Sequence, residues 1–226
     1  MVQVFTAYIA IFLIAIEIFL IPPISLRIQP SCDAHRTEPP SVWVQRWSHL
    51  IKPAGTVLDV ACGRGRHTRW FHARGHMLTA VDRSAEALHA IDLPIATCEK
   101  ITADIEQGRW PFEGRHFDAV VVTNYLWRPL LPTLANSLAP GGVLIYETFA
   151  QGNETVGKPS RPDFLLVTGE LLTVCMRLRV VAFEDGFESG ATALTPAAGA
   201  ATPRFVQRIT AVRSDVFAGS TRYPLA

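Results

Sequence analysis

The stretch VLDVACGRG at residues 57–65 decides the fold. Val57 to Val60 is apolar and rich in β-branched residues apart from Asp59, which is typical of a strand buried on both faces of a parallel sheet. Gly63 and Gly65 follow at once and predict a tight turn that leads into a helix. The stretch therefore predicts a strand–turn–helix unit with a carboxylate near the strand's end.

The same alternation continues on the C-terminal side. Helices are expected after the first, second and fourth strands, over residues 67–74, 85–91 and 130–138. Further strands are expected over residues 77–81, 95–101, 117–123 and 143–148, with a tight turn at 140–142. A helix at 169–176 and strands at 178–184 and 205–212 complete the pattern. This order predicts an α/β fold: a doubly wound, Rossmann-like, mostly parallel sheet with an antiparallel strand pair at its C-terminal end.

A carboxylate stands near the end of each of the first three expected strands. Asp59 lies within the first strand, Asp82 directly follows the second, and Asp104 comes shortly after the third. Ligands bind beyond the carboxyl ends of the strands in such sheets. A nicotinamide site needs G-x-G-x-x-G, but Thr68 stands at the third glycine position, and Asp59 would repel a pyrophosphate. The carboxylates suit a cationic cofactor that bears an amine, with Asp82 accepting from ribose hydroxyls and Asp104 from an exocyclic amine.

Five elements together resemble the class I S-adenosylmethionine-dependent methyltransferases. They are residues 57–65, 80–84 (AVDRS), 104–105 (DI), 117–121 (FDAVV) and 138–144 (LAPGGVL). Ala61 departs from the family, which usually has glycine there. Residues 65–68 (GRHT) and 169–172 (GELL) are similar to the tellurite-resistance-type branch.

The resemblance implies S-adenosylmethionine as the cofactor and assigns residues to its parts. Asp59, Gly63 and Gly65 would hold the methionine part, Asp82 the ribose, and Asp104 with the Ile105 backbone the adenine. Arg83, next to Asp82, is also expected to bind the cofactor. No metal is expected.

The methyl acceptor is expected beyond the fourth strand, where Asn124 and Tyr125 are candidates to position it. The alternative is that Tyr125 packs against the cofactor or the core. Asn124 is not followed by the Pro-Pro-aromatic run of enzymes that methylate DNA amines, which argues against a nucleobase acceptor. Glu147, Arg128 and Arg161 are secondary candidates, and the two arginines have an alternative as surface charges.

Three functions follow in order of preference. The first is transfer of a methyl group from S-adenosylmethionine to a small-molecule acceptor by in-line displacement. The second is a non-catalytic protein of the same fold that binds the cofactor or acts as a membrane scaffold. The third is a nicotinamide-dependent oxidoreductase.

The N-terminus carries an apolar run over residues 4–21 whose one charge is Glu17. A run of this length is the minimum for a membrane-spanning helix, and the basic residues that follow it would leave the catalytic domain in the cytoplasm. The alternatives are an extension from a start codon assigned too far upstream, or a buried helix. We therefore expect a hydrophobic segment at 1–21, a proline-rich linker at 22–40, the methyltransferase domain at 41–213 and a tail at 214–226.

Composition narrows the remaining classes. The 226 residues are 49% hydrophobic, which excludes general disorder, and the formal net charge of +1 gives no reason to expect a nucleic-acid partner. The four cysteines have no paired spacing, which favours free thiols in a reducing compartment, hence a cytoplasmic protein. The sequence predicts no oligomeric state.

Overall fold

The computed structural model describes residues 38–190, 202–214 and 222–225. The chain divides into two compact units, residues 1–34 and 35–226, and the described residues all belong to the second. Residues 4–21, with the alternatives weighed for them, lie outside the described part. Among the described residues no helix is long and apolar enough to cross a membrane.

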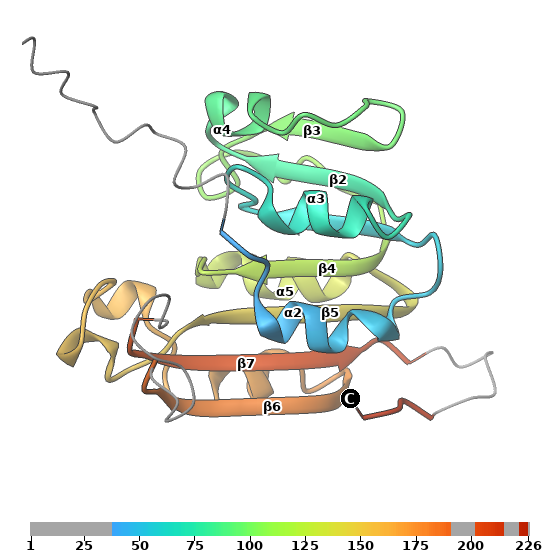
Figure 1. Cartoon of the computed structure of the whole chain (residues 1–226). Helices are drawn as coiled ribbons and strands as arrows, with labels where there is room; N and C mark the ends of the chain where they lie inside the picture. Colours follow the sequence, from blue (N-terminus) through green and yellow to red (C-terminus); the bar gives the residue numbers. More distant parts are fainter. Residues whose placement is uncertain (1–37, 191–201, 215–221, 226) are drawn as a thin grey trace, which may run out of the picture. The chain divides into compact units, whose positions relative to one another are not determined.

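A seven-stranded sheet with the order β3-β2-β1-β4-β5-β7-β6 forms the centre of this unit (Figure 1). Its strands are β1 (Thr56–Val60), β2 (Met77–Asp82), β3 (Cys98–Thr102), β4 (Phe117–Thr123), β5 (Leu138–Phe149), β6 (Arg179–Glu188) and β7 (Arg204–Val212). Strands β1 to β5 run parallel, and β7 is antiparallel to both β5 and β6. The predicted doubly wound sheet with an antiparallel pair is confirmed.

The helices that connect these strands are short. They are α2 (Val42–Trp47), α3 (Arg66–His72), α4 (Ala85–His89), α5 (Leu131–Asn136) and α6 (Glu170–Val174). Single 3₁₀ turns add η2 (Ser48–Leu50), η3 (Arg128–Leu130), η4 (Asn153–Thr155) and η5 (Pro162–Phe164).

Each face of the sheet has its own apolar core. Figure 1 views the sheet from the face that α2 and α3 cover. On that face, side chains of β1, β4 and β5 pack against buried aromatic residues of α2 and α3: Trp43, Trp47 and Phe71. On the other face, the alternate strand residues pack against leucines of α5 and α6: Leu131, Leu134 and Leu171. Strands covered on both faces explain the continuous apolar runs of the sequence.

One local prediction was wrong. Residues 140–142 do not form a separate tight turn, because β5 runs through them from Leu138. Gly141 adopts φ +76° and its N–H donates to the carbonyl of Arg213 on the continuation of β7. The pairing between β4 and β5 shifts register here, so the glycines form an irregularity within the strand.

Gly65 fixes the turn between β1 and α3. It is the residue before α3, with φ +75°, and a Cβ placed on it would lie 2.6 Å from Cδ1 of the buried Ile91. Both the backbone conformation and the close approach therefore require glycine.

We expect Gly65→Ala to lower the free energy of unfolding by about 1–2 kcal/mol from the left-handed backbone. Overpacking against Ile91 should add about 1–3 kcal/mol. Gly114→Ala is the matched control, because Gly114 has φ +76° with no atom within 4 Å of the point where a side chain would begin. Urea unfolding of both variants measures the difference, and equal losses would show that Ile91 moves aside at no cost.

Candidate functional site

A cavity of about 260 Å³ lies at the carboxyl edge of the sheet. Parallel strands deliver their carboxyl ends to one edge, so segments that follow β1, β2, β3 and β4 meet there. The lining residues are Ala61, Asp82, Arg83, Ala103, Asp104, Ile105, Glu106, Tyr125 and Phe164. Four of the seven residues predicted to bind the cofactor therefore line one cavity: Asp82, Arg83, Asp104 and Ile105.

Asp82, the last residue of β2, ties two turns together. One carboxylate oxygen accepts the N–H of Gly63 at 2.8 Å, and the other accepts the N–H of Ser84 at 2.9 Å. These two bonds fix the plane of the carboxylate. Each oxygen keeps a second lone pair, so the fixed carboxylate can still accept from hydroxyl groups of a ligand.

The turn after β1 leaves room for a ligand. Gly63 has φ +54°, and no atom lies within 4 Å of the place where a side chain would start. Ala61 also has a positive φ, +51°, a conformation that alanine rarely adopts. The departure at Ala61 therefore keeps the left-handed backbone that glycine would take more easily.

Asp104 and Ile105 present opposite hydrogen-bonding groups to the cavity. The Asp104 carboxylate accepts the N–H groups of Glu106 and Gln107 through Oδ1, and these bonds hold its pKa below the ordinary value. Its other oxygen, Oδ2, accepts no hydrogen bond from the described residues. The Ile105 N–H likewise has no hydrogen-bond partner within the described ranges. The pair thus offers one acceptor and one donor side by side.

Asp59 lies beneath the turn and does not line the cavity. Its side chain is buried and accepts a 2.6 Å hydrogen bond from the Thr68 hydroxyl. Burial raises the pKa of Asp59 from 3.8 to about 6, although the bond from Thr68 opposes the rise. A buried carboxylate of this kind favours a cation nearby.

His67, the second residue of α3, connects the site to the segment before α2. Its Nε2 accepts the N–H of Ser41 at 3.0 Å, so its proton must be on Nδ1, which lies 3.4 Å from the hydroxyl of Thr123. Burial lowers the pKa of His67 to about 3. The imidazole is therefore neutral, and both of its nitrogens are engaged.

Asn124 and Tyr125, the two residues that follow β4, lie in different surroundings. Asn124 is exposed with φ +54°, and its side chain does not line the cavity. Tyr125 lines the cavity, and burial, with the nearby Glu106 carboxylate, raises the pKa of its hydroxyl. The structure thus places Tyr125 with the predicted cofactor residues and Asn124 outside them.

The secondary candidates are engaged with other protein groups. Glu147 is 1% exposed and its carboxylate lies 2.6 Å from Nε of Arg208, its register partner on β7. Arg161 pairs with Asp163 at 2.7 Å on the surface. Arg128 binds Glu170 through two nitrogens.

Three residues of the cavity were not predicted from the sequence: Ala103, Glu106 and Phe164. Glu106 follows the predicted adenine residues directly, so its position in the chain was a usable signal. Phe164 comes from the polar segment after β5, where no periodicity or motif points to the site. With Glu106, the cavity holds three carboxylates against one guanidinium, which suits a cationic ligand.

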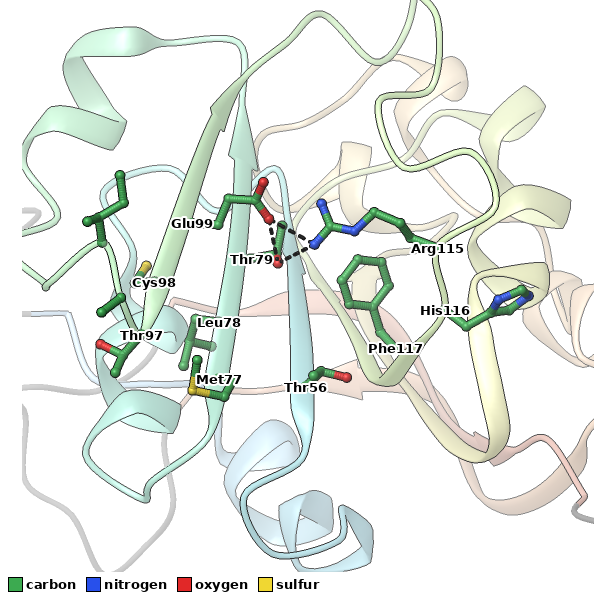
Figure 2. Close-up of a pocket in the computed structure, with 12 residues that line it drawn as sticks. Thr56, Met77, Leu78, Thr79, Thr97, Cys98, Glu99, Arg115, His116 and Phe117 are labelled. Carbon is green, nitrogen blue, oxygen red and sulfur yellow. Dashed lines mark hydrogen bonds and ion pairs between the residues drawn. The ribbon is translucent and has the colours of Figure 1, made fainter.

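A second hollow, of about 340 Å³, lies at the opposite, amino edge of the strands. Figure 2 shows its lining, where the Arg115 guanidinium points at Glu99 and Thr79. None of the predicted site residues lines it.

The raised pKa of Asp59 predicts how stability depends on pH. Between about pH 4 and 6 the folded protein holds a proton on Asp59 that the unfolded chain releases, so this group's contribution to stability falls as pH rises. We expect Asp59→Asn to remove this pH dependence. Its free energy of unfolding should therefore rise by about 3 kcal/mol relative to that of the wild type between pH 4 and pH 7. Chemical denaturation across this pH range measures it.

Asp118 provides a control of opposite sign. Although burial raises its pKa, bonds from Lys52 and Thr56 lower it below the ordinary value overall. Asp118→Asn should therefore lose stability relative to the wild type as pH rises through about 4. Parallel pH curves for the wild type and Asp59→Asn would contradict the assignment to Asp59.

Comparisons with known proteins agree with this geometry. A family model described as a methyltransferase domain matches residues 57–142. Over 104 residues the chain is 35% identical to the malonyl-[acyl-carrier protein] O-methyltransferase of Salmonella typhimurium, a match that covers 43% of this chain and 40% of that relative. The matched region thus spans about two fifths of this curated relative.

Solved structures share the fold. TehB from Haemophilus influenzae is 17% identical with a TM-score of 0.58, and the alignment covers 74% of this chain and 60% of TehB. A TehB-like SAM-dependent methyltransferase from Corynebacterium glutamicum is 15% identical with a TM-score of 0.54, covering 79% of this chain and 91% of that one. Residues 57–142 thus match a methyltransferase domain, and the described part of the chain shares its fold with these solved structures, as the motifs predicted.

Proposed function

We propose that this protein transfers a methyl group from S-adenosylmethionine to a small-molecule acceptor. The observation that carries the proposal is the cavity that gathers Asp82, Arg83, Asp104 and Ile105 beside the open turn at Gly63. Membrane anchoring through residues 4–21 and a cytoplasmic location of the catalytic domain remain part of the proposal.

The cavity's own chemistry fits the cofactor. S-adenosylmethionine carries a sulfonium and an ammonium group, and the cavity and its floor carry more carboxylates than cations. We assign the ribose hydroxyls to the free lone pairs of Asp82. The adenine amine is assigned to Asp104, and an adenine ring nitrogen to the N–H of Ile105. The methionine part is assigned to the turn at Gly63 and Gly65, above the buried Asp59.

When bound, the cofactor supplies a methyl group on a good leaving group, so a strong protein nucleophile is not needed. The protein's contribution is to orient two reactants and to exclude water. The fixed carboxylate of Asp82 and the rigid Gly65 turn hold one reactant. We place the acceptor beyond the end of β4, next to Asn124, because Tyr125 already lines the cofactor cavity.

Asp82→Ala should weaken the binding of S-adenosylmethionine at least tenfold, about 1.4 kcal/mol, because two charge-assisted hydrogen bonds to hydroxyls are lost. Asp92→Ala serves as the control, since Asp92 is exposed and does not line the cavity. Calorimetric titration of the full chain measures both. An affinity unchanged in Asp82→Ala would remove the ribose assignment.

Asn124→Ala should lower kcat for methyl transfer at least tenfold while the affinity for the cofactor stays within twofold, because Asn124 lies outside the cofactor cavity. The acceptor is first identified by incubating the full chain with labelled cofactor and a cell extract, and finding by mass which compound gains a methyl group. The extract should retain small carboxylic acids and carrier-linked acyl groups, since the Salmonella relative is named for such an acceptor.

The outcomes of that assay also separate the rival functions. Tight cofactor binding with no methyl transfer to any compound would favour a non-catalytic protein. Enhanced fluorescence of a reduced nicotinamide on titration would favour an oxidoreductase.

A further inference from the structure

Phe164 reaches the cofactor cavity from a distant part of the chain. It is the last residue of η5, within the segment between β5 and α6, whereas the other lining residues follow β1, β2, β3 or β4. Its side chain is 42% exposed although it is large and apolar. The Arg161 guanidinium lies over the ring, 5.2 Å from its centroid, and the rest of the half-exposed ring leaves apolar surface beside the cavity for a ligand.

Arg128 holds the turn that carries Phe164. Its Nη1 donates to the carbonyl of Asp163 at 3.0 Å, and its Nη2 donates to the carbonyl of Leu165 at 2.7 Å. These carbonyls belong to the residues on either side of Phe164. One guanidinium therefore fixes the backbone directly before and after the ring.

Glu170, the first residue of α6, holds Arg128 in turn. Its two carboxylate oxygens accept from Nε and Nη2 of Arg128 at 2.8 and 3.0 Å. Oε2 of Glu170 also accepts the N–H of Val167 at 2.9 Å, three residues after Phe164. The turn is thus tied both to the start of η3 and to the start of α6.

The cavity needs this ring for chemical reasons. Most of the other long side chains that line the cavity are charged: Asp82, Arg83, Asp104 and Glu106. A nucleobase has flat apolar faces as well as polar edges, and aromatic side chains bind those faces. Phe164 and Tyr125 supply the aromatic surface of the cavity.

We infer that Phe164 is a specificity-determining residue for the nucleoside end of the cofactor, and that Arg128 is its positioning residue. The inference rests on the proposed function and extends it to a segment that no motif marks. It also gives Arg128 a role other than positioning the methyl acceptor.

Phe164→Ala should weaken binding of S-adenosylmethionine, S-adenosylhomocysteine and 5′-methylthioadenosine by a similar factor of about ten, because all three carry the same base. Phe164→Tyr should keep the affinity of the wild type. Phe164→Leu, which keeps the apolar bulk but not the aromatic ring, should keep only part of it. Phe187→Ala is the matched control: Phe187 is 51% exposed, lies on β6 and does not line the cavity. Equal affinities of Phe164→Ala and Phe187→Ala would overturn the inference.

A double-variant comparison tests the positioning role. Arg128→Lys keeps a positive charge beside Glu170 but loses the two-pronged hold on the carbonyls. It should weaken cofactor binding alone and add nothing in the Phe164→Ala background, because it acts through the ring. If the affinity losses of the two single variants add in full in the double variant, Arg128 does not act through Phe164.

Asp82→Ala separates this inference from the proposed function. If Asp82→Ala weakens binding and Phe164→Ala does not, the cofactor site stands and the role of Phe164 is wrong. If neither variant changes the affinity, the cofactor site itself is wrong, and the role of Phe164 falls with it.

Discussion

The site depends on one carboxylate, that of Asp82. Its two oxygens hold the N–H of Gly63 in the turn after β1 and the N–H of Ser84 in the turn after β2. Each bond to an ionised acceptor is stronger than one between neutral groups, and together they lock two loops to one plane. Under the proposed function the same carboxylate would accept the ribose hydroxyls, so one group would both shape the turns and bind the ligand.

A second constraint is electrostatic. Asp59 is buried below the turn and has a pKa of about 6, while carboxylates of Asp82, Asp104 and Glu106 line the cavity above it. Gathering negative groups destabilises the protein in the absence of a counter-charge. Under the proposed function a cationic cofactor would offset that cost.

The segments beyond β5 are held by contacts between residues far apart in the sequence. Arg128, the first residue of η3, fixes the turn of Phe164 and is itself fixed by Glu170 on α6. Glu147 and Arg208 form a buried pair in register between β5 and β7. Removing one partner of a buried pair costs about 3–5 kcal/mol, which makes such pairs strong local constraints on geometry. These contacts decide which side chains reach the cavity.

The sequence alone determined a mostly parallel sheet and the place of Asp82 and Asp104 near the carboxyl ends of its strands, because strand periodicity and turn chemistry are local and parallel strands end at one edge. Arg83 and Ile105, which line the same cavity, were named through the resemblance to a family. Local signals misjudged residues 140–142, where pairing with β7 keeps the glycines inside a strand. Only the tertiary structure buried Asp59, engaged Arg128 with Glu170, and brought Phe164 to the cavity. The burial of a charge and the meeting of residues far apart along the chain depend on how the chain packs, and no spacing along the sequence records that.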